Sequence, residues 1–173
     1  AAQHLRWREP MAKPSTLHLL LLDTAGSMRQ GGRLARAKGY AAQVLEQAAR
    51  AGDHVALLCF GGQGVEVLVP PGPARRAAAV RVQQRGGGGG TPLAQAMVAA
   101  DNLMAQHRRV RGTSASTAPT GLWLLTDGRT LEQPRAPQGA DQLVVVDFDD
   151  AKVRVGRCAD WAERWGAEYR RGG

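Results

Sequence analysis

The stretch LHLLLLDTAGS, residues 17–27, decides the prediction of the fold. A short, almost continuous apolar run is typical of a strand that is buried on both faces of a sheet. Asp23 ends this run, and a loop with three glycines follows it before residue 33. Residues 33–50 are then rich in alanine and carry apolar side chains at helical spacing. A strand, a glycine-containing loop and a helix in this order are typical of an open α/β fold.

Further strands and helices alternate along the rest of the chain. The second and third strands form an antiparallel hairpin through Gly61–Gly64, and the prolines from Pro70 onward end it. The predicted fold class is α/β, with an open, mostly parallel, doubly wound sheet, helices on both faces and one antiparallel strand. We expect residues 1–16 to form an N-terminal arm and residues 17–171 to form one domain. The later predicted strands are 55–60, 65–69, 122–125, 143–146 and 167–170, and the later predicted helices are 74–82, 93–107 and 155–165.

Composition limits the class of protein. The chain has 173 residues, of which 43% are hydrophobic and 22% charged, as in soluble globular domains. No apolar run approaches the roughly 20 residues that span a bilayer, and no export leader is recognised, so we expect a cytoplasmic protein. Cys59 and Cys158 are too few for a disulfide framework and are expected to be reduced thiols. Because the first residue is not Met, we expect a segment of a longer protein.

Positive charge is the unusual feature of the composition. Lysine and arginine number 23 against 15 acidic residues, which gives a net charge of +8. Solvated helix faces account for this excess, and a docking surface for an acidic protein is a second interpretation. A basic, nucleic-acid-binding α/β domain is an alternative from another class, although aromatic residues make up only 5% of the chain and few bases could stack on them.

Oxygen-bearing side chains follow the predicted strands in glycine-containing loops. Asp23 and Ser27 follow the first strand, Thr91 follows the run Gly86–Gly90, and Asp127 follows the strand at 122–125. Ligands of open α/β sheets bind beyond the carboxyl ends of the strands, so these loops are expected to meet. Mg²⁺ prefers about six oxygen ligands, of which one or two are carboxylates. The four side chains are therefore candidate Mg²⁺ ligands, and Mn²⁺ could replace Mg²⁺.

Several separated motifs resemble one protein family. The order Asp23-x-x-x-Ser27, Thr91 before a helix, and Thr126-Asp127-Gly128 after a strand is similar to a von Willebrand factor type A domain with a metal-ion-dependent adhesion site. Five further segments resemble the C-terminal domain of the D subunit of magnesium chelatase and its cobaltochelatase-associated relatives. These segments are RLARAKG at 33–39, DHVAL at 53–57, LVPP at 68–71, GGGTPLA at 88–94 and LTDGR at 125–129.

The resemblance implies a fold and a function. The implied sheet order is 3-2-1-4-5-6. A Mg²⁺ ion at the top of the sheet would be held directly by Ser27 and Thr91 and through water by Asp23 and Asp127, and a partner's Asp or Glu would complete its coordination. The partners of such a subunit are an AAA+ ATPase chelatase subunit and a large tetrapyrrole-binding subunit. The expected function is metal-dependent assembly without catalysis by this domain alone, and an adaptor of another MoxR-type AAA+ ATPase is the alternative within the family.

Two positions depart from the family pattern. Ala25 stands where the first serine of Asp-x-Ser-x-Ser is expected, so one hydroxyl ligand is missing and a water would have to replace it. Gly61 follows Phe60 where the chelatase-like domains tend to carry arginine. The residues that the resemblance places against a partner are Gly26, Met28, Gly90 and Arg129.

Other interpretations of the same residues compete with a metal site. The segment Asp23-Thr24-Ala25-Gly26 is superficially similar to the aspartic protease signature, but an all-β context is not predicted. The run Gly86–Gly90 lacks the lysine of a phosphate-binding P-loop and could be a flexible spacer. No histidine has zinc-site spacing, and no nucleophile elbow occurs, so no catalytic residue is assigned. Asp147, Asp149 and Asp150 could line the same face or form a solvated acidic loop.

Overall fold

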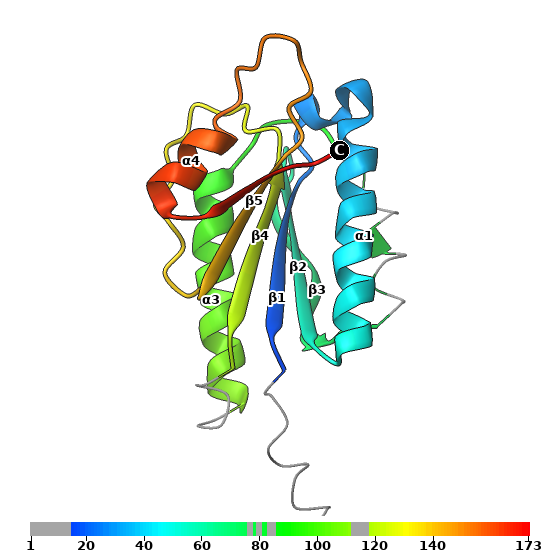
Figure 1. Cartoon of the computed structure of the whole chain (residues 1–173), viewed down its shortest axis with the longest axis vertical. Coiled ribbons are helices and arrows are strands. Elements are labelled where there is room, and N and C mark those ends of the chain that lie inside the picture. The colour runs from blue at the N-terminus through cyan, green and yellow to red at the C-terminus, as the bar shows by residue number, and fades with distance from the viewer. Residues whose placement is uncertain (1–14, 76–77, 79–80, 83–85, 112–117) are drawn as a thin grey trace, which may run out of the picture.

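The structure is a computed structural model that describes residues 15–75, 78, 81–82, 86–111 and 118–173 (Figure 1). The expected arm, residues 1–16, lies outside the described residues except for its last two positions. The strands are β1 Leu17–Asp23, β2 His54–Gly61, β3 Gly64–Pro73, β4 Thr120–Thr126, β5 Gln142–Asp147 and β6 Glu168–Arg171. The helices are the 3₁₀ helix η2 Gly26–Gly32 and the α-helices α1 Arg33–Ala51, α3 Leu93–Arg111 and α4 Cys158–Trp165.

The strands form one six-stranded sheet in the order β3-β2-β1-β4-β5-β6. The pairs β1–β2, β1–β4, β4–β5 and β5–β6 are parallel, and β2–β3 is antiparallel. The predicted fold class and sheet order are therefore confirmed. The chain goes from β1 to β2 on one side and later returns to β4 on the other side, so the strand order reverses at the carboxyl end of β1.

Helices cover both faces of the sheet (Figure 1). Alternate residues of β1 point to opposite faces, and Leu19 and Leu21 pack with α3 and α4 on one of them. Leu20 and Leu22 pack with α1 on the other face. All four side chains are fully buried. Two apolar layers thus fix β1 on both sides, and the carboxyl end of this strand is a rigid place for functional side chains.

The strand β3 continues past the prolines that were expected to end it. Pro73 pairs with His54, and Pro70 and Pro71 lie at a shift of register opposite Ala56, between the pairs Val55–Gly72 and Leu57–Val69. Proline has no amide proton to donate, but an edge strand tolerates it where the backbone faces solvent or forms a bulge. The predicted end of this strand was wrong because β3 is the edge of the sheet.

Two other element predictions need correction. The predicted helix at 155–165 begins only at Cys158, because the amides of Val155 and Gly156 donate to the Asp149 carboxylate instead of entering a helix. The loop predicted after β1 contains the 3₁₀ helix η2. Of the helix predicted at 74–82, residues 78 and 81–82 are helical, and the remainder is not helical or lies outside the described residues.

No described helix is long and apolar enough to cross a membrane. The two cysteines, Cys59 and Cys158, are buried and form no disulfide. Cys59 belongs to the apolar layer under α1, and Cys158 to the layer formed with α3 and α4. Both thiols therefore serve as packing residues of the core.

Candidate metal centre at the carboxyl ends of the strands

Asp23 lies at the end of β1, where the strand order reverses, and is only 1% exposed. One carboxylate oxygen, Oδ1, accepts a hydrogen bond from the Ala25 amide at 2.8 Å. The other, Oδ2, accepts one from the Thr126 hydroxyl at 2.6 Å. The Thr126 hydroxyl in turn accepts a hydrogen bond from the Gly128 amide. Asp23 therefore joins the loop after β1 to the loop after β4 and sets their relative position.

Burial raises the pKa of Asp23 from 3.8 to about 7, and the hydrogen bonds from Thr126 and Ala25 offset part of this rise. The folded metal-free protein therefore holds a proton that the unfolded chain releases near pH 4. Because the native state binds more protons than the unfolded state between these pKa values, stability must fall as pH rises from about 4 to about 7. Above pH 7 this contribution should stay constant.

We expect the free energy of unfolding, measured by urea titration in a chelator, to fall by on the order of a few kcal/mol between pH 5 and pH 7.5. In Asp23→Asn, which cannot ionise, this part of the fall should disappear. The pKa values of Asp149 and Asp150 are lowered, so these groups change stability only at more acidic pH and do not contribute to this fall. An identical pH dependence in the parent and in Asp23→Asn would contradict the assignment of the burial effect to Asp23.

Asp127, directly after β4, is fully buried. Its Oδ1 accepts a hydrogen bond from the Arg129 amide at 3.1 Å. Its Oδ2 has no hydrogen-bond partner among the described residues, and the Arg33 Nη1 lies 3.7 Å from it. A buried carboxylate oxygen without a donor is costly unless a cation compensates it. Among the described residues, this oxygen is the strongest single sign of a cation site.

The glycine run passes over the carboxyl end of β1 and contacts it through the backbone. The Gly88 amide donates to the Thr24 carbonyl at 2.6 Å, and the Gly26 amide donates to the Gly89 carbonyl at 2.7 Å. The Gly62 amide, from the turn between β2 and β3, donates to the Gly88 carbonyl at 2.8 Å. The alternative interpretation as a free spacer is therefore wrong for Gly88 and Gly89, which join two loops.

We call the contact of Gly88 and Gly89 with Gly26 and Gly62 the crossing of glycines. Side chains would not fit in it. A Cβ at Gly62 would lie 2.5 Å from the Gly89 Cα, and a Cβ at Gly89 would collide with the Gly62 Cα. Gly89 also has a φ of +80°, which favours glycine. Thr91 follows two residues later, half-buried, and its carbonyl accepts the Leu93 amide at the start of α3. The crossing of glycines thus sets where Thr91 enters the site.

The start of α3 is capped from another segment. The Glu132 carboxylate, in the loop after β4, accepts a hydrogen bond from the Ala94 amide at 2.8 Å. A carboxylate at a helix N-terminus satisfies a free amide and complements the helix dipole. Glu132 provides a cap in the structure, and it also connects the Thr91 segment to the Asp127 loop.

The two departures from the family pattern are next to each other in space. A Cβ at Gly61 would collide with the Thr24 hydroxyl, which donates to the Phe60 carbonyl at 3.2 Å. A larger residue at position 61 is therefore incompatible with threonine at position 24 in this conformation. Ala25 is fully buried beside them and contributes no oxygen from its side chain.

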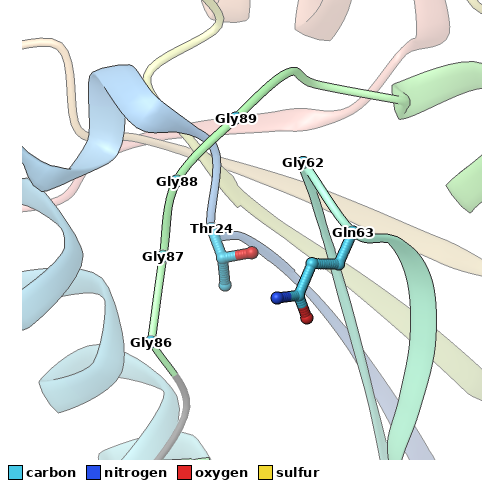
Figure 2. Close-up of a pocket in the computed structure, with 7 residues that line it drawn as sticks. All are labelled: Thr24, Gly62, Gln63, Gly86, Gly87, Gly88 and Gly89. Atoms are coloured by element: carbon cyan, nitrogen blue, oxygen red, sulfur yellow. The ribbon is translucent and has the colours of Figure 1, made fainter.

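A pocket of about 510 Å³ lies beside this crossing (Figure 2). It is lined by Thr24, Gly62, Gln63 and the segment Gly86–Gly89, and Gln63 lies across the pocket from Thr24. The Thr24 hydroxyl is already donated to Phe60. Among the described residues, the lining is mostly backbone and contains no acid, base or thiol.

The four residues that were expected to contact a partner differ in how exposed they are in the structure. Gly26 is half-buried and held by Gly89, and Gly90 is exposed. Arg129 is partly exposed, and its guanidinium donates to Asp149 at 3.0 Å. Met28 is fully buried in the apolar layer under α1, so the expected contact between its side chain and a partner is wrong. Methionine at this position fills the core below the loop.

Of the three acidic residues at the end of β5, Asp147 and Asp149 are buried and not solvated, whereas Asp150 is exposed and pairs with Arg33 and Arg36. Asp149 is 1% exposed and accepts hydrogen bonds from Val155, Gly156 and Arg129. Burial would raise its pKa, but these hydrogen bonds outweigh burial and lower the pKa below its usual value. Asp149 thereby positions Arg129 at the edge of the site.

The sequence analysis missed Arg33, which lies near Asp127. Asp149 and Asp150 were named there as residues that could line the same face, and in the structure they pair with Arg129 and Arg33. One available signal was an arginine at the first position of a helix whose first turn contains no acidic residue. A cation there is unfavourable for the helix dipole and so indicates a tertiary partner.

The donor set fits a hard cation in part. Within the described part of the chain, no group of three or more His, Cys, Asp and Glu side chains could hold a metal ion. A metal here would therefore depend on the Ser27 and Thr91 hydroxyls together with the free Oδ2 of Asp127. Both Asp23 oxygens already accept hydrogen bonds, which suits an indirect role. Because Ala25 adds no oxygen, at least one position would be filled by water or by a partner.

Comparison with known proteins shows which family has this fold. A family model for the von Willebrand factor type A domain matches residues 18–129, and the chain belongs to this family. A solved von Willebrand factor type A protein from Catenulispora acidiphila superposes with a TM-score of 0.59 at 18% identity. The match covers 79% of this chain and 33% of that protein, and it supports the fold alone.

Curated relatives define the branch of the family more closely. The chain is 32% identical over 142 residues to the magnesium-chelatase 67 kDa subunit of Heliobacterium mobile, covering 80% of this chain and 20% of that subunit. It is 36% identical over 126 residues to the magnesium-chelatase 60 kDa subunit of Rhodobacter capsulatus, covering 73% and 21% respectively. The chain thus spans about a fifth of the length of these relatives. It is a von Willebrand factor type A domain similar to part of magnesium chelatase subunits.

Proposed function

We propose that this domain is a metal-dependent assembly module of a D-type chelatase subunit. Its partners would be an AAA+ ATPase subunit and a large tetrapyrrole-binding subunit of a magnesium or cobalt chelatase in the cytoplasm. The observation that carries the proposal is the buried Oδ2 of Asp127, which lacks a hydrogen-bond donor where the segments bearing Asp23, Ser27 and Thr91 converge. The similarity to magnesium chelatase subunits supports the choice of partners.

The residues of this chain would have different roles in the metal site. Asp127, Ser27 and Thr91 would hold Mg²⁺ or Mn²⁺, and Asp23 would orient the surrounding loops through Ala25 and Thr126. When bound, the metal ion supplies positive charge and an open coordination position for a carboxylate from the partner. Arg129, held by Asp149 at the rim, would attract the same acidic segment. No proton transfer is required of any residue, which agrees with an assembly role.

Co-precipitation with the AAA+ chelatase subunit from the same genome tests this role. We expect the full 173-residue chain to capture that ATPase in Mg²⁺ and to lose most of it in a chelator. Capture that is the same in Mg²⁺ and in chelator would contradict metal dependence. Failure to capture this ATPase, with metal-dependent capture of a different MoxR-type ATPase, would retain the metal site but change the partner.

Restoring the missing hydroxyl should strengthen the site. Ala25 is fully buried, and its amide already donates to Asp23, so serine at this position would add an oxygen on the loop that carries Ser27. We expect Ala25→Ser to bind Mg²⁺ roughly tenfold more tightly, because one protein ligand would replace a water. Calorimetric titration measures this directly, with Ala25→Gly as the control that adds no oxygen. An unchanged affinity in Ala25→Ser would contradict the ligand assignment.

A further inference from the structure

Arg33 occupies a position that local physical chemistry disfavours. It is the first residue of α1, preceded by Gly32 without a side-chain cap, and a cation there opposes the helix dipole. Its side chain is only 7% exposed, although buried charges are costly unless they are paired. The reason for an arginine at this position must therefore lie in its tertiary contacts.

Those contacts lead to the candidate metal centre. The Arg33 Nη1 donates to the Ser27 carbonyl at 3.1 Å and lies 3.7 Å from the Asp127 Oδ2. The Arg33 Nε donates to Asp150 at 2.9 Å. Asp150 also accepts a hydrogen bond from Arg36 at 2.5 Å, and these two arginines lower its pKa. Arg33 is thus held between an anchoring carboxylate and the carboxylate of the site.

We propose that Arg33 is a built-in counter-cation of this centre, which compensates Asp127 in the metal-free protein and thereby weakens the binding of a divalent metal. This inference rests on the proposed function, because it concerns the same site. The distance between Arg33 and Asp127 is an ion-pair distance without a hydrogen bond, so Oδ2 remains available. A second cation bound at this oxygen would be repelled by the guanidinium at close range in a buried environment.

The test is a calorimetric titration of the full chain with Mn²⁺ and with Mg²⁺. We expect Arg33→Gln to bind both ions roughly tenfold more tightly than the parent, because the repulsion of like charges is removed. Arg33→Lys keeps the charge and should remain close to the parent. The matched control is Arg36→Gln, which removes the same charge one turn along α1 from a residue that also contacts Asp150. Unchanged or weaker binding by Arg33→Gln would overturn the inference.

Unfolding experiments provide a readout that is independent of partner binding. In a chelator, Arg33→Gln should melt at a lower temperature than the parent, because Asp127 loses its compensating cation. Added Mg²⁺ should raise the melting temperature of Arg33→Gln more than that of the parent. If the variant is unfolded without metal, Mg²⁺ should refold it, and a variant that Mg²⁺ does not stabilise would overturn the inference.

The outcomes separate this inference from the proposed function. If Ala25→Ser binds Mg²⁺ more tightly than the parent and Arg33→Gln does not, the metal site stands and only the role of Arg33 is wrong. If the parent, Ala25→Ser and Arg33→Gln all fail to bind Mg²⁺ and Mn²⁺, metal dependence is wrong and the role of Arg33 is overturned with it.

Discussion

Gly89→Ala is expected to destabilise the domain by roughly 2–4 kcal/mol, because the new Cβ would collide with the Gly62 backbone at a residue whose φ of +80° already disfavours a side chain. Neither strain can be relieved locally, since both neighbouring segments are fixed by backbone hydrogen bonds. The Gly62 amide is bonded to Gly88, and the Gly26 amide to Gly89. Urea unfolding at constant pH measures the loss of stability.

The same substitution should also weaken Mg²⁺ binding, because Thr91 follows two residues later and its position depends on the crossing. Gly90→Ala is the matched control from the same run. Position 90 has open space around an added Cβ and needs no left-handed backbone, so its unfolding free energy should stay within about 0.5 kcal/mol of the parent. A Gly89→Ala protein as stable as the control, with unchanged Mg²⁺ affinity, would show that the crossing does not position the site.

Asp127→Ala is expected to remove most of the metal-dependent capture of the AAA+ chelatase subunit, because loss of a residue that supports a metal site weakens metal affinity by about 10–100-fold. The substitution removes the buried carboxylate oxygen that has no hydrogen-bond donor. The fold should survive, because Arg33 keeps its hydrogen bonds to Ser27 and Asp150. Circular dichroism and pull-down of the same preparation in Mg²⁺ measure both properties.

Glu46→Ala is the control for the loss of one negative charge. Glu46 is an exposed residue of α1 whose contact is an ion pair with Arg50. Exposed pairs of this kind contribute little to stability, so this variant should capture the partner as well as the parent does. Equal capture by Asp127→Ala and the parent would contradict the proposed role of the buried carboxylate.

Much of the fold could be predicted because the pattern of apolar residues along the chain follows from which side chains are buried. The run from Leu17 to Leu22 lies between two apolar layers, and its almost continuous hydrophobicity predicted that double burial. The alanine-rich helix after it was predicted because apolar side chains recur at helical spacing, and α1 is found at Arg33–Ala51. The sheet order was implied by the family resemblance and could not follow from local periodicity, which does not specify which strands are neighbours.

The errors arose where tertiary contacts override local preference. Proline was expected to end β3, but this strand lies at the edge of the sheet, where a missing amide proton costs little. The residues before Cys158 resemble a helix in sequence, but the Asp149 carboxylate binds the amides of Val155 and Gly156. No local pattern reveals an acceptor that lies several residues away in a loop.

Some residues of the candidate site could be predicted from the sequence, and others depend on tertiary contacts. Asp23 and Asp127 could be found because Asp23 ends one buried strand and Asp127 directly follows another, and the structure joins their two loops through Thr126. Arg33 was assigned to a helix motif, and its position beside Asp127 depends on how α1 packs on the sheet. The family resemblance placed Met28 against a partner, yet the turn of η2 directs its side chain into the core.

The central claim is that this face of the domain binds a divalent metal ion, and calorimetric titration of the purified chain with Mg²⁺ and Mn²⁺ tests it most directly. We predict saturable binding at one site in the parent that is lost in both Thr91→Ala and Asp127→Ala. No saturable binding by the parent or by Ala25→Ser would contradict the claim.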